Sequence, residues 1–325
     1  MRAPAFWYDG TRIPLWARLL EPVYIGLRAL HALPWRLHLR RAPRLPQPLL
    51  VIGNLTAGGS GKTPLVLALL QLLRDAGWHP GVISRGYGRS TRAARRVAPH
   101  DRADQVGDEP LLIARRAQVP LAVARRRVQA AALLQTAGVD ILVADDGLQH
   151  RALRADVRIA VVDGRRRFGN GHLLPAGPLR EPATALARMD YVLCNGGTAQ
   201  PGEYAMQLLP QALRAVASDS AHSAPPQPPA RVHALAGIGD PQRFFAALRA
   251  QGYAVIEHAF ADHHAYSKDD FAFDDGSLPL LMTEKDAVKC LPFARAHWWL
   301  QPVTARLDAA FAADLLARLA AMRRV

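Results

Sequence analysis

The chain has little cysteine, few aromatic side chains and no long apolar run. Its two cysteines, Cys194 and Cys290, lie far apart and outside any CxxC or zinc-ligand spacing, which argues against a disulfide scaffold or a structural zinc site. Charged residues interrupt every apolar stretch well before the roughly 20 residues that a bilayer-crossing helix needs. We therefore expect a protein of a reducing compartment with no transmembrane helix.

Acidic residues are also few relative to basic ones. The 325 residues include 27 Asp and Glu against 41 Lys and Arg, nearly all arginine, for a formal charge of +14. Such a surplus favours a partner rich in phosphate, with nucleic acid, nucleotide and anionic lipid as candidates. Aromatic residues gather in the first fifty positions and near Trp298, which leaves no basic-aromatic platform for stacking bases. We expect no nucleic-acid partner, and the sequence indicates no obligate protein partner.

Residues 1–45 have the pattern of an amphipathic helix. The first fifty residues hold eight arginines and two acids, with five tryptophan and tyrosine side chains between them. This composition suits a helix that lies among lipid headgroups, and a helix that packs on the domain behind it explains the pattern equally well. The apolar residues at helical spacing are Trp16, Leu19, Leu20, Val23, Leu27 and Leu30.

From residue 46 onward, short apolar runs alternate with longer stretches of helical composition. This alternation predicts βαβ units and an α/β fold with a mostly parallel, doubly wound sheet over residues 46–217. The predicted strands are 49–52, 81–84, 120–123, 140–144, 158–162 and 191–194, with helices over 64–76 and 126–137. A proline-rich stretch, 218–230, reads as a linker or exposed loop, and 231–325 as a smaller C-terminal α/β lobe.

The strongest local signal is VIGNLTAGGSGKTPL, where an apolar strand leads through a glycine-rich turn into a helical pattern. This is the context of a phosphate-binding P-loop, in which the backbone N–H groups surround phosphate oxygens, Lys62 pairs with them and Thr63 binds magnesium. The pattern departs from GxxxxGK[ST] because Thr56 occupies the first glycine position. The predicted nucleotide-binding residues are Thr56, Ala57, Gly58, Gly59, Ser60, Gly61, Lys62 and Thr63.

Two aspartates, Asp145 and Asp146, end the apolar run ILVADDG. A carboxylate at the end of such a strand lies close to the magnesium of a neighbouring phosphate loop. Aspartate after a strand also commonly caps a turn. Together with the phosphate loop, the pair is interpreted as a magnesium site, which gives ATP and Mg²⁺ as the expected cofactors.

A phosphate loop alone does not distinguish a GTPase, an ATPase motor and a small-molecule kinase. The segment TEKD (283–286) has its lysine third rather than second, unlike the guanine-selecting [NT]KxD, and argues against a GTPase. The main rival is an NTPase that couples hydrolysis to protein or metal-cofactor assembly. The second, a nucleic-acid-binding ATPase suggested by the charge of +14, is disfavoured by the lack of a basic-aromatic platform.

Seven motifs occur in order along nearly the whole chain and together resemble the tetraacyldisaccharide 4'-kinase family. They are GNLTAGGSGKTP, SRGYGR (84–89), GDEP (107–110), DDGLQH (145–150), LLPAGPLREP (173–182), DHHAY (262–266) and TEKDAVK (283–289). The resemblance implies transfer of the ATP γ-phosphate to the 4'-hydroxyl of a tetraacylated disaccharide 1-phosphate, a glycolipid of lipid A biosynthesis. It also implies a membrane-associated N-terminal helix and a peripheral location on the cytoplasmic face of the bacterial inner membrane, next to anionic lipid.

The resemblance further implies a catalytic pair, Asp108 in GDEP and His263 in DHH. A sugar hydroxyl is a poor nucleophile, so a base must accept its proton, and a histidine beside a carboxylate gains basicity and orientation. From the residues alone, Asp108 with Pro110 also reads as a helix N-terminus, and His263 as a surface histidine.

Basic and hydrogen-bonding side chains are expected around the glycolipid, because it carries a phosphate and sugar hydroxyls. For each arginine, a solvated surface cation is as good an interpretation as substrate contact. The candidate substrate residues are Arg85, Tyr87, Arg126, Gln149, His150, Arg180 and Glu181.

Overall fold

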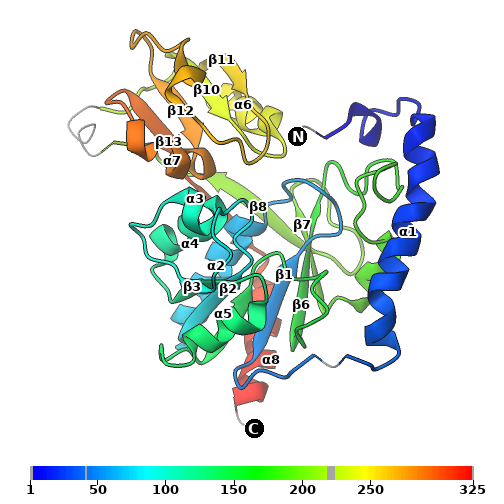
Figure 1. Cartoon of the computed structure of the whole chain (residues 1–325). Helices are drawn as coiled ribbons and strands as arrows, with labels where there is room; N and C mark the ends of the chain where they lie inside the picture. The colour runs from blue at the N-terminus through cyan, green and yellow to red at the C-terminus, as the bar shows by residue number, and fades with distance from the viewer. Residues whose placement is uncertain (1–2, 41, 218–223, 324–325) are drawn as a thin grey trace.

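The computed structural model describes residues 3–40, 42–217 and 224–323, and a twisted sheet forms the centre of its larger lobe (Figure 1). Neighbouring strands are parallel except at β3 and β14, which pair antiparallel with β4 and β8. In spatial order the strands are β14 (Val303–Leu307), β8 (Tyr204–Pro210), β7 (Tyr191–Asn195), β6 (Val157–Asp163), β1 (Leu49–Gly53), β5 (Ile141–Ala144), β2 (Pro80–Ser84), β4 (Leu121–Val123) and β3 (Arg95–Arg96). Strands β2 to β5 lie on one side of β1 and β6 to β8 on the other, so the switch point of the sheet lies at β1.

Both faces of this sheet are covered at its centre, which explains why the central strands β1 and β5 are apolar throughout. Leu50 and Ile52 of β1 face a core that contains residues of α2 (Lys62–Asp75), α4 (Asp108–Ala117) and α8 (Ala309–Arg323). Leu49 and Val51 point to the opposite core, with residues of α5 (Arg127–Leu134). Burial of alternate side chains on two faces stabilises the parallel strands and fixes their register. The short helices α3 (Ala103–Val106) and η2 (Ala183–Arg188) lie in connecting segments.

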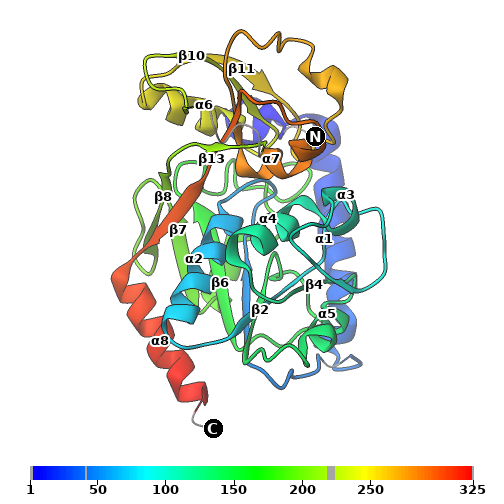
Figure 2. The same cartoon turned by 90° about the vertical axis from the view of Figure 1, so that its left-hand side faces the viewer.

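A smaller lobe has its own sheet and lies above the first in Figures 1 and 2. Its core contains Trp298, Phe271 and Phe245, each almost fully buried, and the Trp298 indole donates to a carboxylate oxygen of Asp274 over 2.6 Å. The strand order is β11 (Ala254–Ala259), β10 (Arg231–Ala236), β12 (Leu280–Thr283), β13 (Trp298–Gln301) and β9 (Arg214–Ala215). The helices are α6 (Pro241–Ala250), α7 (Glu284–Cys290), η4 (Lys268–Phe271) and η5 (Leu291–Phe293).

The N-terminal segment forms η1 (Ala5–Trp7) and one long helix, α1 (Leu15–Arg36), along the side of the larger lobe (Figure 1). Three polar residues of α1 attach it to residues 172–181. Glu21 accepts from the Leu173 N–H over 2.7 Å, and the Tyr24 hydroxyl donates to the Arg180 carbonyl over 2.9 Å. Arg28 lies 3.2 Å from Glu181. Among the described residues, no helix is both long and apolar enough to cross a bilayer.

The predicted α/β fold with a mostly parallel sheet is confirmed, and each predicted strand of the first domain lies within one residue of an observed one. The predicted domain limits need correction at the C-terminus. Strand β14 and helix α8 belong to the larger lobe, where Phe311, Leu315 and Leu319 are buried in its core. Strand β9, before the predicted linker, belongs to the smaller sheet. Residues 218–223 of that linker lie outside the described part, and 224–230 form neither helix nor strand.

Candidate active site

The turn between β1 and α2 is the glycine-rich segment expected to bind phosphate. Gly61, directly before α2, has a φ of 91°, and a Cβ there would collide with the side-chain amide of Asn195, so glycine is required. Lys62 begins the helix, with Nζ 3.0 Å from Asn54 Oδ1 and 3.4 Å from Asp146 Oδ1. The first N–H groups of a helix have no helical partner, so this terminus is suited to bind an anion.

A second motif supports the phosphate loop from the side. The Ala57 N–H donates to the Pro178 carbonyl over 2.7 Å, and Thr56 forms a β-bridge with Leu179. The motif LLPAGPLREP therefore shapes the first half of the phosphate loop.

The two aspartates after β5 have contrasting environments. Asp145 is almost fully buried, and neither of its carboxylate oxygens has a hydrogen-bond partner among the described residues. Burial, followed by the charges of Glu109 and Asp146, raises the pKa of Asp145 to about 7. Burial also opposes ionisation of Asp146, but the cations of Lys62 and Arg180 outweigh it and lower its pKa to about 2. One carboxylate is thus paired with cations, and the other lacks a partner.

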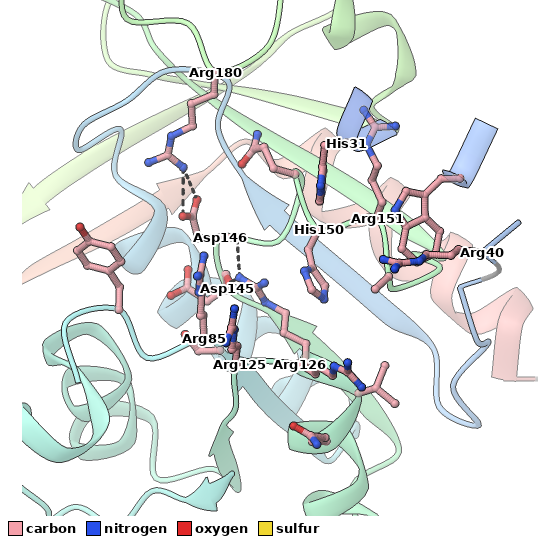
Figure 3. Close-up of a pocket in the computed structure, with 18 of the residues that line it drawn as sticks. His31, Arg40, Arg85, Arg125, Arg126, Asp145, Asp146, His150, Arg151 and Arg180 are labelled. Carbon is pink, nitrogen blue, oxygen red and sulfur yellow. Dashed lines mark hydrogen bonds and ion pairs between the residues drawn. The ribbon is translucent and has the colours of Figure 1, made fainter. Parts of the chain in front are cut away.

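A cavity of about 1210 Å³ opens beside these aspartates (Figure 3). It is lined by side chains from α1 and from the segments that follow β2, β4 and β5, among them His31, Arg85, Arg125 and Arg151. Arg180 extends toward Asp146, at 3.2 Å. Of the predicted substrate residues, those that line the cavity are Arg85, Tyr87, Arg126, Gln149, His150 and Arg180.

Glu181 is placed differently from the other predicted substrate residues. It is buried outside the cavity lining, where it pairs with Arg28 of α1 at 3.2 Å and with Arg188 at 3.1 Å. Its carboxylate therefore attaches α1 to the segment that carries Arg180.

His150 lies in this cavity without a hydrogen-bond partner for its buried Nε2 in the described part of the chain. Burial, together with the charges of Arg127 and Arg85, lowers its pKa to about 4. The imidazole is consequently neutral at physiological pH and available to bond a hydroxyl group.

Asp108 and His263 meet across the two lobes. His263 Nδ1 lies 3.1 and 3.0 Å from the two carboxylate oxygens of Asp108, although the residues are 155 positions apart. Burial favours the neutral acid, but the hydrogen bond from His263 and the charge of Lys285 outweigh it and hold the pKa of Asp108 at about 2. Asp108 is also the first residue of α4, so the helix-start interpretation and the pairing with histidine hold together.

Several residues that support the site were not singled out from the sequence. Asn54 accepts from Lys62, and Asn195 donates to the Ser60 carbonyl over 2.9 Å. Each is a buried asparagine at the end of an apolar strand, and this position in the sequence could have marked it as part of the site. Arg127 donates to the backbone carbonyls of Asp145 and Asp146, at 3.1 and 2.7 Å. Its sequence neighbours are arginines too, so only the fold shows which of the three is buried.

A phosphate loop at the switch point of a parallel sheet, with a carboxylate pair on the adjacent strand, defines the class of P-loop nucleotide-binding proteins. Residues 15–320 match the family model described as tetraacyldisaccharide-1-P 4'-kinase, LpxK. The chain belongs to this family, and the resemblance of its motifs is thereby confirmed.

Curated relatives and a solved structure agree with this assignment. The chain is 50% identical to the tetraacyldisaccharide 4'-kinase of Shewanella amazonensis, over 95% of this chain and 93% of the relative. It is 49% identical to that of Xanthomonas euvesicatoria, over 98% and 96%. The fold is similar to a crystal structure of LpxK from Aquifex aeolicus in complex with ATP, with a TM-score of 0.74, 25% identity, and coverage of 92% and 96%.

Proposed function

We propose that this protein transfers the γ-phosphate of ATP to the 4'-hydroxyl of tetraacyldisaccharide 1-phosphate. The observation that carries the proposal is the contact of Asp108 with His263 beside the arginine-lined cavity, where Tyr87 of the cavity lining packs on the His263 ring, in a chain of the 4'-kinase family. An NTPase that assembles other proteins has no need of a proton acceptor for a sugar hydroxyl next to an arginine-lined cavity.

Nucleotide phosphates fit at Thr56–Thr63, where Lys62 exchanges its contacts with Asn54 and Asp146 for phosphate oxygens. Mg²⁺ fits between Thr63 and the aspartates after β5, because the partnerless oxygens of Asp145 are hard ligands of the kind that Mg²⁺ prefers. When bound, the ion would neutralise charge on the transferring phosphoryl group. Few protein ligands are expected, because Mg²⁺ keeps several waters and phosphate oxygens in its shell.

Asp108 is proposed to accept the proton of the 4'-hydroxyl, with His263 as its partner. The Nδ1 atom of His263 is occupied by the Asp108 carboxylate, whose oxygens retain further lone pairs. A carboxylate with a pKa of about 2 is a weak base, but phosphoryl transfer depends mainly on positioning and charge stabilisation. The hydrogen bond from the His263 imidazole orients the Asp108 carboxylate and stabilises its negative charge.

The sugar hydroxyls and 1-phosphate are assigned to the cavity of Figure 3. The candidate groups remain Arg85, Tyr87, Arg126, Gln149, His150 and Arg180, while Glu181 acts through its ion pair with α1.

The protein is proposed to bind the cytoplasmic face of the inner membrane peripherally, through α1. Large apolar side chains on the outer side of this helix are exposed, including Leu15 at 72%, Leu19 at 64% and Leu27 at 62%. An exposed apolar face with arginines nearby is suited to an anionic lipid surface. The acyl chains of the substrate would then lie next to the cavity, which α1 lines with Tyr24, His31 and Trp35.

The test is a transfer assay in detergent with Mg²⁺, γ-labelled ATP and the tetraacyl disaccharide 1-phosphate. We expect label in the lipid, reduced by at least about 100-fold in Asp108→Ala because the proton acceptor is lost. Asp104→Ala, which removes an exposed carboxylate of α3, is the matched control and should retain activity. ATP hydrolysis without labelled lipid would instead favour the assembly NTPase.

A further inference from the structure

Lys285 is a buried cation at the junction of the lobes. It lies on α7 in the motif TEKD, and its side chain is only 15% exposed. Its Nζ lies 3.1 Å from Glu109 Oε1, 3.1 Å from Asp262 Oδ1 and 3.2 Å from His263 Nε2. Burial opposes the charge, but the carboxylates of Glu109, Asp262 and Asp108 outweigh this effect and raise the pKa of Lys285. The residue is therefore an ammonium ion.

These contacts determine the protonation of the His263 ring. An ammonium group has three donors and no acceptor, and here it faces three acceptors. In the contact with His263, Nε2 must then be the acceptor, so the ring proton is on Nδ1. That proton is the one donated to Asp108, at 3.0 Å. A continuous series of bonds thus runs from Lys285 through the imidazole to the carboxylate.

Two further features restrict the position of the His263 ring. Tyr87 packs on it with ring centroids 5.0 Å apart, and the His263 backbone has a φ of 60°, which is uncommon for a residue other than glycine. Such a conformation persists where surrounding contacts enforce it.

We propose that Lys285 is a positioning residue for phosphoryl transfer, which fixes the tautomer and orientation of His263 so that Nδ1–H is directed to Asp108. This inference rests on the proposed roles of Asp108 and His263. It assigns a role to TEKD, which the phosphate loop and the aspartate pair leave without one.

A purely structural role, in which Lys285 only joins the lobes, is the alternative. The neighbouring residue offers a matched control, because Glu284 joins the same two helices through an ion pair with Arg116 at 2.6 Å. That pair crosses the α4–α7 contact without touching the Asp108–His263 pair. Arg116→Met should weaken the lobe contact while leaving the histidine tautomer unchanged.

The first experiment needs no Lys285 variant. The protein is labelled with ¹⁵N-histidine, and the ring signals of His263 are assigned by their loss in His263→Gln. At neutral pH we expect a protonated Nδ1 and an unprotonated Nε2. A protonated Nε2 in the native protein would overturn the proposal, whether or not the protein proves to be a lipid kinase.

The second experiment compares Lys285→Met with Arg116→Met in both transfer assay and spectrum. For Lys285→Met we expect kcat to fall roughly 100-fold, little change in KM for ATP, and mixed tautomers at His263. Arg116→Met should keep the native tautomer and most of kcat. Equal loss of kcat in the two variants, or an unchanged tautomer in Lys285→Met, would leave Lys285 with only a structural role. If Lys285→Met does not fold, the measurement on the native protein still decides.

Discussion

At the scale of the residue, the site contains a buried carboxylate that the fold itself does not satisfy. Both oxygens of Asp145 lack partners among the described residues, whereas Asp146 beside it is paired with Lys62 and Arg180. A buried carboxylate without a partner costs free energy, which is tolerated when a ligand supplies the missing contacts. This contrast supports the assignment of Asp145 to the bound cation.

Asp145→Asn is expected to stabilise the ligand-free protein. With a pKa of about 7, Asp145 binds its proton more tightly in the folded than in the unfolded chain, so it reduces stability as pH rises from about 4 to 7. Asparagine has no such proton to lose. In urea unfolding with EDTA near pH 8, we expect a gain of roughly 1–3 kcal/mol in the free energy of unfolding, together with loss of kinase activity.

Asp156→Asn is the matched control. Its carboxylate accepts from the Leu49 N–H over 2.9 Å, so its removal should lower stability. A loss of stability in Asp145→Asn as well would contradict the interpretation of Asp145 as an unsatisfied carboxylate.

At the scale of the element, α1 has two distinct sides. Glu21, Tyr24 and Arg28 contact residues 172–181, and the same segment carries Arg180 to Asp146. The large apolar residues on the outer side of α1 stay exposed and are not covered by other described parts of the chain. One helix thus connects the proposed lipid surface to the site of transfer.

Leu19→Glu with Leu27→Glu should reduce binding to vesicles that contain an anionic phospholipid, because each charge must leave water at the bilayer surface. We expect at least about a tenfold loss of bound protein in sedimentation, with nucleotide binding unchanged. Leu291→Glu, an exposed leucine of the smaller lobe at 38%, is the control and should bind as the native protein does. Equal binding by all three proteins would contradict a role of α1 at the membrane.

At the scale of the whole molecule, acid should weaken the fold through histidines in both lobes. Burial comes first among the causes that lower the pKa of His150 and of His258 to about 4 each. The His258 ring lies within hydrogen-bond distance of His233 and stacks on the ring of Phe273. The unfolded chain binds protons near pH 6.5, so stability is present above that value and is lost as pH falls from 6.5 toward 4.

His258→Gln should reduce this pH dependence. The slope of the free energy of unfolding with pH between about pH 4 and 6.5 reports how many protons the protein takes up on unfolding. This number should decrease by up to one, because one titrating group is removed. Urea unfolding across this range gives the slope. The control is His79→Gln, at an exposed histidine, which should not change the slope. An unchanged slope in His258→Gln would contradict the assignment of acid sensitivity to His258.

Much of this molecule could be read from local sequence. The central strands of the larger lobe are apolar because both faces of a parallel sheet are buried there, and the phosphate loop needs glycine where the backbone turns into α2. These features depend on neighbours in the chain, so their residues show them directly. For the same reason, the order of the motifs was enough to identify the family.

The tertiary structure decided what depends on distant residues. The return of β14 and α8 to the first sheet follows from their fit to a core formed much earlier in the chain. The contact of Asp108 with His263, the burial of Arg127 rather than Arg126, and the ion pairs of Glu181 all join segments that folding brings together. Sequence determined which chemical groups the protein has, and long-range packing determined which of them meet, because contact energies act through space and not along the chain.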